Sequence, residues 1–213
     1  FNSCLNLSEI TLPTSLSALG SNAFSNCTKL KNVNFEKGFS CGLQRGVFAN
    51  CTGLTEIIIP KNIPYIGDSA FSGCSRLKTV TVEDNSTEVY KSVFNNCPNI
   101  RIIKGYDCSY VKKYYDSLTE NQKKSIKFES LGEGAHQFTA EKVKTKEPTC
   151  TEKGIKAYRC EICGKTTGEE ELPAYDHNWN NGVITKQATE TEEGEIKYTC
   201  RRCGEVKTEK IPK

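Results

Sequence analysis

The sequence predicts a β-rich repeat solenoid followed by two small all-β modules. Three observations carry this prediction. In the first half, Phe and Cys recur together with a period of about 23 residues, which is typical of repeat architectures. In the second half, a Tyr-x-Cys-x-x-Cys-Gly segment begins at Tyr158 and again at Tyr198. Only 36% of the residues are hydrophobic, which is too few for one large central core. A unit of this size cannot bury an apolar face by itself, so the units must stack.

Each unit of the first repeat contains a Phe that is followed three residues later by a Cys. Later in each unit, apolar residues alternate with a residue that is usually polar, as in Ile10-Thr11-Leu12, and this period of two predicts one short half-buried strand. Stacking places the strands in a parallel sheet on one face, with short helical or irregular segments elsewhere. Because the fifth unit has Gly105 at the second apolar position, we expect about five units over residues 1–105. The Phe and Cys pairs are Phe1 and Cys4, Phe24 and Cys27, Phe48 and Cys51, Phe71 and Cys74, and Phe94 and Cys97.

Residues 23–30 read Ala-Phe-Ser-Asn-Cys-Thr-Lys-Leu, and residues 70–77 read Ala-Phe-Ser-Gly-Cys-Ser-Arg-Leu. With the turns Leu19-Gly20 and Ile66-Gly67, this pattern resembles the BspA-like leucine-rich repeats of bacterial surface proteins, over residues 1 to about 105. The resemblance implies a leucine-rich-repeat solenoid and an extracellular location, secreted or on a bacterial cell surface.

The five regularly spaced Cys residues are expected to be buried, reduced thiols. A free Cys behaves as a small buried hydrophobe, and one such residue is needed in every coil. Pairing neighbours in an odd-numbered series would also break the repeat. We expect Asn26 and Asn50, which begin Asn-Cys-Thr triplets, to shape a turn rather than to accept a sugar.

Residues 106–135 are expected to close the array and to lead into a linker. Ser109 is a candidate cap for a short helix in which Tyr110, Val111 and Tyr114 share one face. Alternation over residues 125–131 predicts a final strand. The resemblance implies the same arrangement, because the family commonly ends in a Tyr-containing helix and a strand.

The two predicted β modules, residues 136–175 and 176–213, are too small for self-sufficient cores and need a staple. Cys-x-x-Cys-Gly is typical of a zinc knuckle, so Cys150, Cys160 and Cys163 with His136 or His177 are candidate ligands of a structural zinc. Cys200 and Cys203 form a weaker second candidate, because Glu190 replaces the first Cys there. A Cys160–Cys163 disulfide, or free thiols, are the alternatives. Both modules also resemble short His/Cys repeats at the C-termini of bacterial cell-surface proteins.

Composition and charge argue against several functions. The net charge of +3 gives no sign of a nucleic-acid partner, and no apolar run is long enough to insert this segment into a membrane. With two His residues and no orienting partner visible for either, we expect no enzyme and no required cofactor. The chain lacks Met and begins inside a repeat unit, so we expect a piece of a longer protein.

The outward positions of the predicted strands are the candidate binding surface. We expect a monomeric, non-enzymatic adhesion or recognition protein that binds a host or matrix protein or a glycan through this face. The alternative is a structural spacer that displays another domain. The candidate residues are Glu9, Thr11, Asn32, Asn34, Glu56, Ile58, Thr79 and Thr81.

Overall fold

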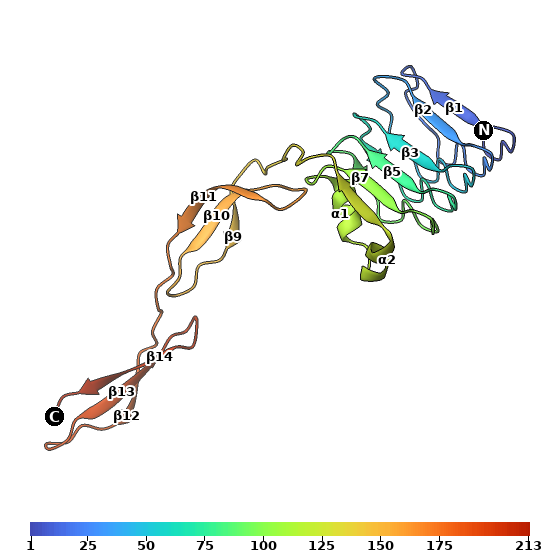
Figure 1. The fold of residues 1–213 in the computed structure, drawn as a ribbon. Coiled ribbons are helices and arrows are strands. Elements are labelled where there is room, and N and C mark those ends of the chain that lie inside the picture. Colours follow the sequence, from blue (N-terminus) through green and yellow to red (C-terminus); the bar gives the residue numbers. More distant parts are fainter. The chain divides into compact units, whose positions relative to one another are not determined.

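The computed structural model describes all 213 residues, and the chain divides into two compact units, Phe1–Gln137 and Phe138–Lys213. The first unit holds the repeats and both helices, and the second holds two small antiparallel sheets (Figure 1).

The first unit is built from short parallel strands, one for each turn of the repeat (Figure 1). Inward residues align in register across the sheet, as in the row Ile57, Val80 and Ile103. All three are buried. The next residue along each strand, Ile58, Thr81 or Lys104, is exposed or half-buried and faces outward, so the predicted alternation is confirmed. The strands are β1 (Glu9–Leu12), β2 (Asn32–Phe35), β3 (Glu56–Ile59), β5 (Thr79–Val82), β7 (Ile102–Gly105) and β8 (Lys127–Ser130).

The strand ladder is interrupted once. β1 pairs with β2, and β3, β5, β7 and β8 form a separate four-stranded sheet, so β2 and β3 are not hydrogen-bonded neighbours. The coils stay connected elsewhere, because Phe24 N–H donates to the carbonyl of Val47 over 2.8 Å. A second short parallel pair, β4 (Tyr65–Ile66) and β6 (Glu88–Val89), supports the later coils.

The repeated Phe residues form a continuous stack through the array. Phe48, which is fully buried, lies between Phe24 and Phe71 with ring centroids 5.5 Å from each. Each later Cys thiol donates to the carbonyl of the Phe one coil earlier, as from Cys51 Sγ to Phe24 O over 3.2 Å. All five of these Cys residues are free thiols, as predicted; Cys27, Cys51 and Cys74 are buried, whereas Cys4 and Cys97 at the ends of the series are half-buried. The same contact recurs from Cys27 to Phe1, from Cys74 to Phe48 and from Cys97 to Phe71.

The turn before each Cys requires left-handed backbone, which Asn and Gly adopt at least cost. Asn26 has φ of +62°, Asn50 has +58° and Gly73 has +74°. The Asn side chains also form a ladder, in which Asn50 Nδ2 donates to Asn26 Oδ1 over 3.0 Å. The Asn residues therefore shape the turn, as predicted.

The end of the array differs from the expected five units. Helix α1 (Tyr110–Asp116) begins after Ser109, whose side chain accepts from the N–H of Lys112, as predicted. A further helix, α2 (Glu120–Ser125), was not predicted; Thr119 and Gln122 form its capping box. After it comes β8, which confirms the final strand predicted over residues 125–131; β8 pairs in parallel with β7, so the sheet continues past Gly105. Gly105 is needed because a Cβ there would lie 2.3 Å from the Val111 side chain. Neither helix has the length and apolar character needed to cross a bilayer.

The second unit contains two three-stranded antiparallel sheets of the same design. In each sheet the middle strand pairs with both others, and a tight turn carrying the two Cys residues joins the second strand to the third. The first sheet comprises β9 (Val143–Lys146), β10 (Gly154–Arg159) and β11 (Thr166–Leu172). The second comprises β12 (Val183–Lys186), β13 (Gly194–Thr199) and β14 (Val206–Ile211).

Very little apolar surface is buried in this unit. The buried hydrophobic residues after Gln137 are Cys150, Ala157, Cys160, Ile162 and Cys200. Three of these five are cysteines, and Cys200 alone belongs to the second sheet and its turn. Neither sheet therefore has an apolar core of ordinary size.

Candidate metal centres and exposed strand face

The outward row of the repeat sheet carries the predicted binding residues. Glu9, Thr11, Asn32, Asn34, Glu56 and Ile58 are exposed, while Thr79 and Thr81 are half-buried. Ile58 is 51% exposed and stands opposite Thr81 in the register. The row continues into Lys104 and Glu129, which form an ion pair at 3.0 Å and were not among the predicted residues.

A hollow lies on this face at the interruption between β2 and β3. Its volume is about 280 Å³, and Asn32, Asn34, Glu56 and Ile58 are among its lining residues. Four of the eight predicted residues therefore meet at one depression. Exposed Ile58 is the large apolar side chain among them, and the other three are polar or charged.

The Cys-x-x-Cys turns of the second unit are built as knuckles. In the turn after β13, Cys200 N–H donates to Glu205 O over 2.7 Å, and Gly204 N–H donates back to Cys200 O over 2.9 Å. Gly204 has φ of +77°, a conformation that favours glycine. The backbone N–H of Arg202 points at Cys200 Sγ over 3.4 Å, the arrangement that stabilises a thiolate in a zinc knuckle.

Four potential ligands converge at this turn. The ligand atoms of Cys150, His177, Cys200 and Cys203 all lie within 4.8 Å of one another. Cys150 Sγ is 3.8 Å from Cys200 Sγ, and Cys203 Sγ is 3.5 Å from His177 Nδ1. Three thiols and one imidazole form a donor set that zinc prefers.

The environment of the group favours ionisation of one thiol, Cys200, and a fixed imidazole, whereas burial raises the pKa of Cys150 to about 11. Burial raises the pKa of Cys200, but hydrogen bonds from the backbone N–H groups of Cys203 and Arg202 and from the side chains of His177 and Cys203 outweigh it and lower the pKa to about 5. His177 stacks on Trp179, with ring centroids 4.7 Å apart. Its Nε2 lies 3.5 Å from a carboxylate oxygen of Glu205, which leaves Nδ1 directed to the thiols.

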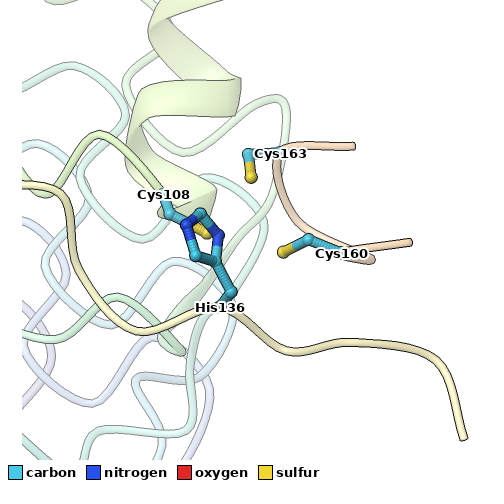
Figure 2. Close-up of side chains that lie close together, drawn as sticks. All are labelled: Cys108, His136, Cys160 and Cys163. Carbon is cyan, nitrogen blue, oxygen red and sulfur yellow. The ribbon is translucent and has the colours of Figure 1, made fainter. Parts of the chain in front are cut away.

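A second group contains Cys108, His136, Cys160 and Cys163, and its ligand atoms also lie within 4.8 Å of one another (Figure 2). The two groups are alike in composition. His136 Nε2 lies 3.0 Å from a carboxylate oxygen of Glu133, as His177 lies near Glu205. Both groups are therefore candidates for binding a metal ion.

The model of the BspA type leucine rich repeat region matches residues 1–131 with six copies. The chain belongs to this family. BspA-type repeats occur in bacterial surface proteins that generally bind other proteins, and no catalytic family is indicated. The sixth copy agrees with the continuation of the sheet into β8.

Three solved structures are similar to parts of the chain. A leucine-rich-repeat protein from T. pallidum is 28% identical, covers 49% of this chain and 49% of that protein, and has a TM-score of 0.46. A leucine rich cell surface protein from Faecalibacterium prausnitzii is 31% identical, covers 60% and 31%, and has a TM-score of 0.45. A leucine-rich repeat protein from Bacteroides ovatus is 24% identical, covers 61% and 46%, and has a TM-score of 0.28. The chain thus spans half or less of each of these proteins, and a search of curated proteins gives no match.

The metal-ligand candidates outside the BspA-type repeats are grouped differently from the prediction. Cys160 and Cys163 lie with His136 but not with Cys150, which lies with His177 at the knuckle of the other module. Glu190 belongs to neither group, so its replacement of a Cys does not weaken the site at Cys200 and Cys203.

Cys108 was not among the predicted ligands, yet a shared spacing along the chain could have identified it. Cys108 precedes His136 by almost the same interval as Cys150 precedes His177. Each His in turn precedes the first Cys of a Cys-x-x-Cys turn by almost the same interval, so the two groups repeat one spacing along the chain.

Proposed function

We propose that the chain is a non-enzymatic recognition module of a bacterial cell-surface protein and that it binds a protein partner through the outward face of its repeat sheet. The single observation that supports this most is the hollow at β2 and β3, which exposed Ile58 lines together with apolar residues such as Val33 and Phe35 and with polar Asn32, Asn34 and Glu56. Apolar side chains bordered by polar ones are the usual composition of a protein-binding surface.

The shape of the surface also supports a protein partner. The outward residues form rows across β3, β5, β7 and β8, so a partner can contact several strands at once. Repeat proteins use such extended faces in this way. The charges of Lys104 and Glu129 on this face are already paired with each other, so a partner can cover them beside Thr81 without burying an unpaired charge there.

The test is a substitution in the hollow. We expect Ile58→Asp to weaken binding to a purified host or matrix protein at least about tenfold, because a buried, unpaired carboxylate costs well over about 1.4 kcal/mol at an interface. The matched control is Ile184→Asp in β12, since Ile184 is 50% exposed and Ile58 is 51% exposed. Binding would be measured by surface plasmon resonance against panels of purified matrix proteins and of glycans.

Three outcomes would contradict the proposal. Equal binding by both variants would show that the hollow is not part of the interface. Binding to glycans alone would replace the protein partner with a carbohydrate. No binding to any component of either panel would favour the structural spacer.

A further inference from the structure

We propose that Cys150, His177, Cys200 and Cys203 form a structural zinc site that clamps the first Cys-x-x-Cys module to the second. Two of the six separations among the ligand atoms equal those of a tetrahedral zinc site, and all four atoms lie within 4.8 Å of one another. With zinc bonds of about 2.3 Å to sulfur and about 2.05 Å to nitrogen, tetrahedral geometry places two sulfurs about 3.8 Å apart, and a sulfur and a nitrogen about 3.5 Å apart. The observed separations are 3.8 Å for Cys150 to Cys200 and 3.5 Å for Cys203 to His177.

The surroundings of the ligands are those of a structural site. Three thiolates and an imidazole fill all four tetrahedral positions, which leaves none open for substrate or catalytic water. The carboxylate of Glu205 beside His177 Nε2 is the usual outer partner of a histidine ligand, because it fixes the tautomer and the ring orientation. Arg202 N–H donates to Cys200 Sγ and so stabilises the thiolate.

The four ligands come from two modules. Cys150 lies in the turn between β9 and β10 of the first module, and the other three belong to the second module and the segment leading into it. An ion held by all four would therefore be a cross-link between residues 50 positions apart, counted from Cys150 to Cys200. Its absence would leave the two sheets joined by the chain and by a few polar contacts.

Those polar contacts converge at the same place. Tyr175 N–H donates to Thr149 O over 2.8 Å, which holds the connecting segment against the turn that carries Cys150. The Arg202 guanidinium bonds the carbonyls of Tyr175 and Asp176 and lies over the Tyr175 ring, 5.3 Å from its centroid. The connecting segment is thus held from both modules beside the four ligands.

The second module needs such a cross-link. Its sheet and turn bury one hydrophobic residue, Cys200, which is itself a proposed ligand. Metal binding can supply the folding free energy that an absent apolar core does not. The ion also has a route in, because exposed Cys203 lines a depression of about 570 Å³ that Thr149, Cys150 and Arg202 share.

The first measurement is the zinc content of the full, untagged chain, refolded with zinc sulfate and weighed by native mass spectrometry. We expect Cys203→Ser to hold one zinc fewer than the unmodified chain, whatever the group at Cys108 binds. Glu190→Ala is the matched control, since Glu190 occupies the position equivalent to Cys150 but lies outside both groups, and it should hold as much zinc as the unmodified chain.

Equal zinc content in Cys203→Ser and the unmodified chain would overturn the site. A disulfide at Cys200 or Cys203 would also overturn the site. It would appear as a loss of two hydrogens from the mass of the zinc-free protein, and peptide mapping would locate it. A second readout needs no variant: cobalt loaded in place of zinc should give the thiolate charge-transfer and tetrahedral ligand-field bands of a Cys3His site. An octahedral cobalt spectrum would contradict the proposal.

Hydrogen exchange tests the clamp itself. We expect the amides of residues 172–178 to exchange at least tenfold faster after EDTA treatment, because the bond from Tyr175 to Thr149 would no longer be held. Residues 56–59 of β3 serve as the internal control and should be unaffected. If zinc binds but residues 172–178 exchange at the same rate with and without it, the ion does not join the modules.

Discussion

The repeat array and the Cys-x-x-Cys modules are stabilised in different ways. Each is made of short strands that cannot bury an apolar face alone. The array stacks its coils, so that Phe48 lies between two other Phe rings and is fully buried. The modules make small separate sheets, and cysteines account for three of their five buried hydrophobic residues.

Cysteine shows the difference most clearly. In the array, Cys51 donates its proton to the Phe24 carbonyl and acts as a buried neutral group. In the modules, Cys200 accepts an N–H and lies beside two other thiols and an imidazole. The same residue type is therefore a packing element in one unit and a candidate metal ligand in the other, because the surrounding donors and acceptors differ.

The largest expected effect on the array is the loss of one ring from its stack. Phe48→Ala should lower the free energy of unfolding by about 3–5 kcal/mol, because it removes a fully buried ring and leaves a cavity between Phe24 and Phe71. Hydrogen exchange of the β3 amides in urea measures this loss.

Two controls relate that loss to the other unit. Trp179 is the single Trp of the chain and lies in the second unit, so its fluorescence midpoint should not move. Val183→Ala in β12, at a position 60% exposed, should change stability by less than about 0.5 kcal/mol. A shift of the Trp179 midpoint in Phe48→Ala would show that the two units do not unfold independently.

Alkaline pH should weaken the array through its buried thiols. Burial is the main cause that raises the pKa of Cys51 to about 12 and of Cys97 to about 11, from an ordinary value of 9.0. Above about pH 9 the unfolded thiols lose protons that the folded thiols keep, so stability is complete below that pH and falls as pH rises toward 12. Each thiol contributes a slope of up to about 1.4 kcal/mol per pH unit.

Cys51→Ser isolates this contribution from other alkaline titrations. Urea unfolding at a series of pH values from about 8 to about 10.5 should give a shallower decline for the variant than for the unmodified chain. Identical declines would mean that the Cys51 thiol titrates alike in the folded and unfolded states.

The smallest effect is expected at the closing helix. Ser109→Ala should cost about 1 kcal/mol, because the Ser109 side chain accepts from Lys112 N–H at the start of α1. Ser117→Ala, at the exposed end of the same helix, is the matched control and should have little effect. Hydrogen exchange of the α1 amides reports the difference. Equal protection in both variants would show that the Ser109 side chain does not stabilise the start of α1.

The prediction from sequence succeeded where structure follows a local period. Alternation in Ile10-Thr11-Leu12 and its repeats predicted the strands and their outward faces, and Ser109 predicted the start of α1. The short helix α2 was missed because its residues, 120–125, include no buried side chain and so give no apolar pattern. Gly105 was interpreted as the end of the array, whereas it makes room for Val111 while the sheet continues.

The sequence by itself determined that the Phe-and-Cys units stack into a parallel sheet, because a fixed spacing of apolar residues admits one register. It also determined that two Cys-x-x-Cys-Gly turns close small hairpins, since the Gly must adopt positive φ next to the second Cys. Only the tertiary structure decided which thiols meet. A ligand set is selected by distance in space. Cys150 lies near Cys200 and Cys203 rather than near Cys160, which is closer in sequence, because the six-residue strand β10 separates Cys150 from Cys160.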